Sequence, residues 1–298
     1  MTDNPVRAAR QFVAVGVDGS TSDDVAIRWA AQEASMRALP LRIVHVANPP
    51  TLPPTMTSDL ADLALAQFGA TTSEIVESAT GRARAVVPGL EVVHEVRPGQ
   101  IVEQLVKSAS GARLLVLGSG QRFDTSKVGL GSVATHVTAH APCPVIVARI
   151  PEQGEPTTGP SVGRVVVGVD GSDASTAAVG FAFEEASRRG LGLTAVHAWQ
   201  YEPDAWMVDV RDIDESDGAG ARVLAESLAG WTEKYPDVDV IARHVQRRPV
   251  QALIEESAGA ALLVVGSHGH GWFAGMLLGS VSQALLRHAG VSVAVART

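Results

Sequence analysis

The sequence predicts an α/β protein made of two similar halves, each with a parallel sheet covered by helices on both faces. Short apolar runs alternate with helical patterns along the chain, as expected for parallel strands joined by helical crossovers. The segment Val13–Ser20 recurs as Val165–Ser172, and a glycine-rich segment after an apolar run recurs near the end of each half. The 298 residues fit two domains of about 150 residues each.

The first half is expected to contain strands and helices in strict alternation. Val13–Val17 is a continuous apolar run, which is typical of a strand buried in a parallel sheet. Val25 and Trp29, with alanines around them, recur at helical spacing, and the prolines of 48–54 require a loop. The expected strands are 13–17, 41–46, 91–96, 114–117 and 145–148, and the expected helices are 22–38, 59–86, 101–110 and 132–140.

The second half repeats this order after a linker. Residues 151–163 carry three prolines and three glycines, a composition typical of linkers. The expected domains are therefore 1–150 and 164–298, joined by 151–163. Strands of the second domain are expected near Val165, Leu193, Val238, Leu262 and Val291.

Charge and cysteine content limit the cellular environment and the classes of binding partner that are expected. The net charge of −8 argues against a surface for nucleic acid or anionic membranes, because phosphate backbones are bound by basic patches. The chain has one cysteine, Cys143, which cannot form an internal disulfide, so a reducing cytoplasm is expected. No apolar run approaches the ~18 residues of a membrane span, so no membrane insertion is expected.

The glycine-rich segment of the second half is the strongest functional signal. The apolar run 262–265 leads into Gly266 and Gly269, and Gly279 and Ser280 follow at the start of a helical pattern. Glycines let a backbone approach a ligand closely, and the free N–H groups of a helix start favour a phosphate. The Ser280 hydroxyl and the N–H groups of 280–282 are expected to donate to phosphate oxygens.

These motifs together resemble the universal stress protein family. Val-Gly-Val-Asp-Gly-Ser occurs at 15–20 and 167–172, and Gly-x2-Gly-x9-Gly-Ser occurs at 266–280. The resemblance covers the chain as two tandem domains, and its Ala- and Arg-rich composition resembles the tandem stress proteins of high-GC actinobacteria. It implies two Rossmann-like domains of the adenine nucleotide alpha hydrolase type, a strand order of 3-2-1-4-5 in each, and ATP as ligand, with or without Mg²⁺.

The resemblance also implies which residues bind the nucleotide. Asp170 either helps to cap the helix that starts near Asp173 or hydrogen-bonds the ribose, and the same holds for Asp18. The residues expected at the second-half site are Asp170, Gly171, Ala198, Val265, Gly266, Gly269, Gly279, Ser280, Val281 and Ser282. Those expected at the first-half site are Asp18, Gly19, Val46, Leu117, Gly118, Gly131, Ser132 and Val133.

The first half departs from the pattern. Gln121 stands where the second half has Gly269, and Gly120 is displaced by one residue. Asp124 adds a negative charge to the loop. Lys127 either compensates this charge or is an ordinary solvated side chain. The first site is therefore expected to bind nucleotide more weakly or not at all.

Histidines and aromatic residues have simpler explanations than a metal site or a lid. His268 and His270 lack a third ligand at a recognisable spacing, and His136 and His140 lack the Glu of a zinc motif, so no metal site is expected. His45 and His197 fall at equivalent strand ends, which indicates a shared structural role. Packing of a loop on the core is favoured over an adenine lid for the aromatic cluster Trp199, Tyr201, Trp206 and Trp231.

Motifs of fast phosphoryl transfer are absent from the sequence. There is no Gly-x4-Gly-Lys-Ser/Thr and no kinase set of Lys and catalytic Asp. The favoured function is a nucleotide-dependent regulator of stress response or growth arrest that acts on an unknown protein partner. A slow ATPase or nucleotidyl enzyme and a scaffold with decayed sites remain alternatives. By the resemblance, the terminal strands 145–148 and 291–296 are sheet edges that pair antiparallel, with homodimers of the chain expected.

Overall fold

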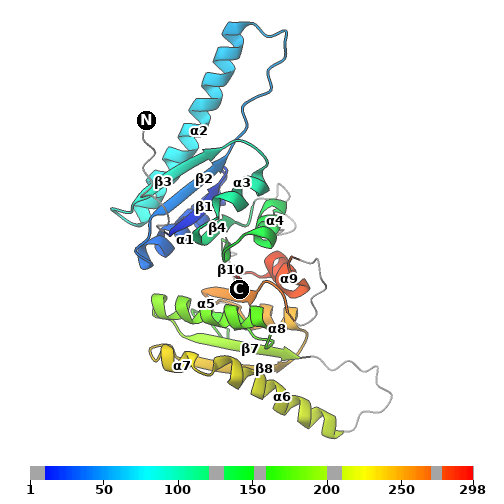
Figure 1. Ribbon diagram of the computed structural model, residues 1–298. Helices are drawn as coiled ribbons and strands as arrows, with labels where there is room; N and C mark the ends of the chain where they lie inside the picture. The colour runs from blue at the N-terminus through cyan, green and yellow to red at the C-terminus, as the bar shows by residue number, and fades with distance from the viewer. Residues whose placement is uncertain (1–10, 121–130, 151–158, 200–209, 270–276, 298) are drawn as a thin grey trace. The chain divides into compact units, whose positions relative to one another are not determined.

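The computed structural model describes residues 11–120, 131–150, 159–199, 210–269 and 277–297 (Figure 1). The described residues up to Ala148 form one compact unit, and those from Arg149 onward form a second. Each unit has the doubly wound α/β fold that the sequence predicts.

The first unit contains a parallel sheet in the order β3-β2-β1-β4-β5, as expected. Helices α1 and α2 pack together, as do α3 and α4, because the crossovers reverse direction between β1 and β4 and so cover opposite faces. The elements are β1 (Phe12–Val17), α1 (Asp23–Met36), β2 (Leu41–Val46), α2 (Ser58–Val86), β3 (Val92–Arg97), α3 (Ile101–Ser108), β4 (Ala112–Gly118), α4 (Ser132–His140) and β5 (Val145–Ala148).

The second unit repeats this topology, with strands in the order β10-β9-β6-β7-β8. A short helix, α7, was not predicted, and β8 and β10 begin two residues later than expected. The elements are β6 (Val165–Gly168), α5 (Asp173–Arg189), β7 (Leu193–Trp199), α6 (Val210–Leu228), α7 (Trp231–Lys234), β8 (Val240–Gln246), α8 (Pro249–Glu256), β9 (Leu262–Gly266), α9 (Ser280–His288) and β10 (Val293–Ala296).

The central strands form the core of each unit. Val13 and Val15 in β1, and Val165 and Val167 in β6, are fully buried because helices cover both faces of these strands. β1 pairs with β4, and β6 pairs with β9, although each pair is far apart in sequence. The carboxyl ends of these neighbouring strands form the switch point at which doubly wound sheets bind ligands.

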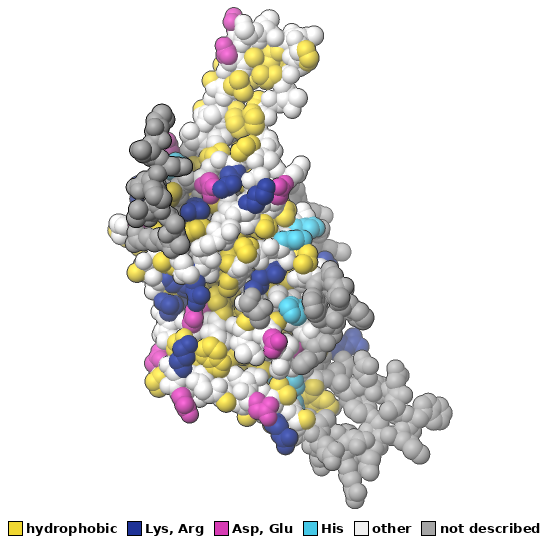
Figure 2. All heavy atoms as spheres, viewed as in Figure 1, with side chains coloured by type: hydrophobic (Ala, Val, Ile, Leu, Met, Phe, Trp, Pro, Cys, Tyr) yellow, Lys and Arg dark blue, Asp and Glu magenta, His cyan; other side chains and the backbone are white. Residues whose placement is uncertain are grey.

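Helix α2 extends beyond the sheet of the first unit (Figure 1). Its buried residues all lie in its second half, whereas Leu60 and Leu63 near its start are exposed. Figure 2 shows apolar side chains along this protruding part. Within the described part of the chain, no helix combines the length and the apolar character needed to cross a membrane.

Candidate functional site

A cleft of about 510 Å³ lies at the switch point of the second unit. It is bounded by the ends of β6, β7 and β9 and by α8 and the start of α9, so it brings together segments from across the second half. Its lining residues are Gly168, Val169, Asp170, Ser175, Val196, Ala198, Pro249, Leu253, Val265, Gly266, His268, Gly269, Gly279, Ser280, Val281 and Ser282.

The glycines of the cleft are needed for space. A Cβ on Gly266 would lie 2.7 Å from the carbonyl oxygen of Ala174, and one on Gly269 would clash with Oδ2 of Asp170. A Cβ on Gly279 would lie 3.1 Å from Cα of His268. The Gly279 N–H donates to the Ser267 carbonyl at 2.7 Å, which closes the two ends of the loop on each other.

The start of α9 faces the cleft with its backbone. Gly279 is the extended N-cap residue and contributes no side-chain cap, so the first N–H groups of the helix have no partner within it. Ser280, Val281 and Ser282, which were predicted to bind phosphate, line the cleft. The Ser282 hydroxyl donates to the Gly266 carbonyl at 2.6 Å, so it holds the end of β9 against the helix.

Asp170 supports the cap of α5 and also borders the cleft. The cap itself is Ser172, whose Oγ accepts the Ser175 N–H at 3.2 Å. Oδ1 of Asp170 accepts the Ser172 N–H at 3.0 Å and the Ser172 hydroxyl at 2.6 Å. Oδ2 lies on the side of Gly269. One carboxylate therefore fixes the turn and stands between the helix start and the glycine loop.

A histidine holds the same turn in each unit. Nδ1 of His197 donates to the carbonyl of Val169 at 2.8 Å, and Nδ1 of His45 donates to the carbonyl of Val17 at 2.9 Å. Each acceptor directly precedes the aspartate of its unit, so the predicted shared role of these histidines is to anchor the end of the first strand. A carbonyl can only accept, so Nδ1 carries the proton in both rings.

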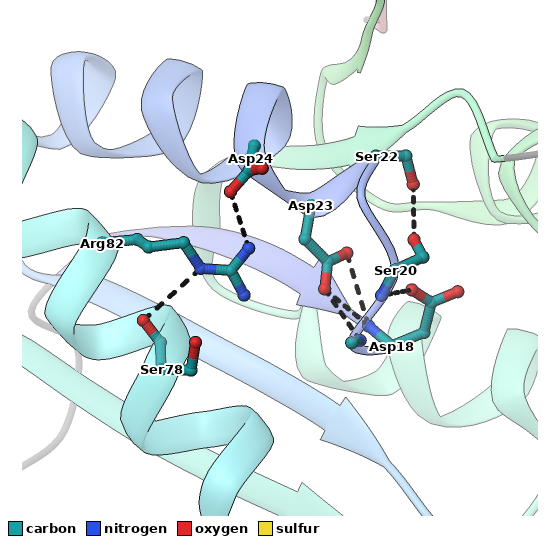
Figure 3. Close-up of polar contacts among 8 residues, drawn as sticks. Asp18, Ser20, Ser22, Asp23, Asp24, Ser78 and Arg82 are labelled. Carbon is teal, nitrogen blue, oxygen red and sulfur yellow. Dashed lines mark hydrogen bonds and ion pairs between the residues drawn. The ribbon is translucent and has the colours of Figure 1, made fainter.

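The two units differ at the fifth residue after the aspartate. In the second unit this residue is Ser175, whose Oγ accepts the Asp170 N–H at 3.1 Å. In the first unit it is Asp23, which is 3 % exposed. Its Oδ2 accepts the Gly19 N–H at 2.8 Å and the Asp18 N–H at 3.2 Å (Figure 3). This difference was not predicted, although it is visible in the sequence when Asp18 is aligned with Asp170.

Burial makes Asp23 an unusual carboxyl group. Desolvation raises its pKa to about 6, and the hydrogen bond that it accepts from the Gly19 N–H acts in the opposite direction. The neighbouring Asp18 raises the pKa further, and Arg82 lowers it. Figure 3 shows that Arg82 is turned to Asp24, to which its guanidinium donates at 2.7 Å.

The remaining first-half residues keep part of the geometry of the second-half loop. The Gly131 N–H donates to the Ser119 carbonyl at 2.9 Å, as Gly279 does to Ser267 in the second unit. A Cβ on Gly118 would lie 2.8 Å from Oγ of Ser22. Gln121, Asp124 and Lys127 lie outside the described residues. Gly131 precedes α4, Ser132 and Val133 begin it, and Val46, Leu117 and Gly118 lie at the ends of β2 and β4.

Several cleft-lining residues were absent from the predicted set. Pro249 and Leu253 come from α8, and no local motif marks them, because only the packing of α8 beside β7 brings them to the cleft. Gly171 was predicted but is not among the lining residues. The other unpredicted residues are Gly168, Val169, Ser175, Val196 and His268.

The predicted aromatic cluster divides between two ring stacks. Trp199 stacks on His244 with centroids 5.9 Å apart, whereas Trp231 stacks on Phe183 at 6.0 Å. Tyr201, Trp206 and His270 lie outside the described residues. His136 and His140 are on the exposed side of α4, where their rings bond to helix carbonyls. Within the described ranges, no three His, Cys, Asp or Glu residues are grouped so as to hold a metal ion.

Comparison with known proteins gives matches to one family in both halves of the chain. A profile of the universal stress protein family matches residues 10–149 and 161–297. A universal stress protein of Mycobacterium tuberculosis is 41% identical over 293 residues, which cover 96% of this chain and 96% of that protein. The crystal structure of a universal stress protein from Archaeoglobus fulgidus has a TM-score of 0.63 at 19% identity, covering 96% of each chain. A universal stress protein solved in complex with cAMP has a TM-score of 0.37 at 26% identity, covering 48% of this chain and 98% of that one.

Proposed function

The chain belongs to the universal stress protein family, and we propose that its second half binds ATP in the cleft of the second unit. The observation that carries this proposal is the combination of an apolar pocket and an open helix start within one cleft of about 510 Å³. This volume lies within the range of about 300–1,000 Å³ that small-molecule sites occupy.

The lining residues suggest how the nucleotide would lie. Val196, Leu253 and Val265 offer apolar surface for an adenine ring, and Ala198 at the end of β7 offers backbone groups beside it. Asp170 lies between this apolar part and the glycine loop, in reach of a ribose. The phosphates would then meet the N–H groups at the start of α9, where the helix dipole favours an anion.

The cleft lining includes no Lys or Arg side chain among the described residues. Backbone N–H groups would therefore carry most of the phosphate contacts, and Mg²⁺ bound with ATP would supply the remaining neutralising charge. These groups bind a nucleotide without forming an evident set for acid–base chemistry. We therefore favour a regulator that changes its partner affinity on nucleotide binding over an enzyme of high turnover. Association of two chains stays a prediction, which light scattering over a range of concentrations would test.

The test is calorimetric titration of nucleotide-free protein with ATP and Mg²⁺, followed by AMP and cyclic AMP. Gly279→Val should abolish binding to the second half, because its Cβ already lies 3.1 Å from the backbone of His268. Gly131→Val changes the equivalent glycine of the first half and is the matched control. Binding that persists unchanged in Gly279→Val protein, or its absence from wild-type protein, would contradict the proposal.

A further inference from the structure

The first-half turn carries a buried carboxylate at the position where the second half has a hydroxyl. Asp23 and Ser175 each lie five residues after the aspartate that follows the first strand of their unit. Both are 3 % exposed, and both accept the N–H of that aspartate. Ser175 lines the cleft of the second unit. The same place in the first unit is therefore occupied by a group that can be charged.

We infer that Asp23 sets the affinity of the first half for nucleotides and makes that affinity depend on pH. The inference rests on the proposed function, since it concerns the equivalent site of the other half. When ionised, Asp23 places a negative charge at the β1–α1 turn, which would border the site of a nucleotide that carries anionic phosphates. When protonated, it resembles the neutral Ser175 and removes this repulsion.

The bonds of Asp23 keep the carboxylate in place. Its oxygens accept the N–H groups of Gly19 and Asp18, so the side chain cannot turn away without leaving two part-buried donors unsatisfied (Figure 3). In the second unit the equivalent acceptor is the neutral Ser175 hydroxyl, which takes the Asp170 N–H. The first-half turn is thus closed on a charged acceptor from its own helix.

Charged and titratable groups around Asp23 come from its own turn and helix, from α2 and from β2. Asp18 on the same turn adds negative charge, and Asp24 follows on α1. Arg82 on α2 is the positive neighbour, and it donates to Asp24. His45 on β2 bonds to the Val17 carbonyl just before the turn. The first turn of α4 contains no acidic residue. Burial and these charges together leave Asp23 with a pKa of about 6.

The direction of the pH effect follows from linkage. A bound polyanion favours the neutral form of Asp23 and so raises its pKa further, which means that binding takes up a proton. First-half affinity should therefore fall as pH rises through about 6. If binding raises the pKa by one unit, affinity falls about eightfold between about pH 5 and about pH 8.

The first test places a carboxyl group equivalent to that of Asp23 in the second half, at Ser175. Ser175→Asp should weaken ATP binding to the second half at about pH 8, and the loss should shrink at about pH 5. Ser175→Asn is the matched control, because it adds similar volume without charge. Comparing the two variants at each pH cancels the protonation of the phosphates themselves. Equal affinity of these variants at both pH values would overturn the inference.

The reverse change tests the first half directly. Asp23→Asn in a Gly279→Val background, where the second site is blocked, should gain several-fold in ATP affinity at about pH 8 and little at about pH 5. No gain at the higher pH would overturn the inference. The proposed function would still stand in that case if Gly279→Val alone removes the binding seen in wild-type protein, so the two failures are distinguishable.

Discussion

Replacing Asp23 by asparagine should stabilise the first unit, and the gain should grow with pH. The Asp23 pKa is raised from 3.8 to about 6 in the folded protein, mainly because burial disfavours the charged form. A carboxyl group with a raised pKa stabilises the fold only while it is protonated. Its contribution is complete below the unfolded pKa and is lost as pH rises through the folded one.

The size of the effect follows from the pKa change. A rise from 3.8 to about 6 corresponds to about 3 kcal/mol of unfolding free energy, all of it lost well above pH 6. Roughly half of this, about 1.4 kcal/mol, should be lost between about pH 5 and about pH 8. The amide that replaces the carboxyl group cannot ionise, so the stability difference between the Asp23→Asn variant and wild type should grow by that amount over this range.

The assay is urea unfolding at a series of pH values, followed by a signal of the first unit such as the fluorescence of Trp29. Asp24→Asn is the control, because Asp24 is exposed and pairs with Arg82 across the surface. Its effect should stay within about 0.5 kcal/mol at every pH. A stability difference for Asp23→Asn that does not change between about pH 5 and about pH 8 would refute the reasoning.

Two further predictions concern the second unit. His197→Leu should lower both stability and nucleotide affinity, because the Val169 carbonyl loses its donor, at a cost of about 1–3 kcal/mol. His197→Asn should restore nucleotide affinity, since an amide N–H can reach the same carbonyl. Calorimetric titration and urea unfolding of both variants would test this, and an Asn variant as weak as the Leu variant would contradict it. Gly180→Ala should destabilise by about 1–3 kcal/mol, because its Cβ would lie 2.6 Å from the Trp231 ring. Gly218→Ala meets no atom within 4 Å and should stabilise by about 0.5–1 kcal/mol, so equal melting shifts for these two would contradict the packing argument.

Several strands and the start of α9 were predictable because local chemistry determines them. β2 and β5 match their predicted bounds, since each is a short, mostly apolar segment that directly follows a proline. The spacing from Gly266 to Ser280 predicted the start of α9 for the same reason. These features depend on residues close together in the sequence.

Other parts of the site depend on contacts between distant segments. Leu253 reaches the cleft only because α8 packs beside β7, and nothing around it in the sequence marks it. The repetition of His45 and His197 was visible, but their bonds to the ends of β1 and β6 follow from strand pairing. The importance of Asp23 likewise emerges only once Ser175 is known to line a cleft.

The position of β1 at the centre of its sheet also affects how the chain folds during synthesis. Val13 pairs with Leu41 on one side and with Leu114 on the other, so its second partner is made about a hundred residues later. Until β4 leaves the ribosome, one edge of an apolar strand has no partner strand, which exposes it to aggregation. The described strands of the first unit are complete by Ala148, before those of the second have been made. The order of synthesis thus separates the two similar sheets in time and lowers the chance that a strand of one half pairs within the sheet of the other.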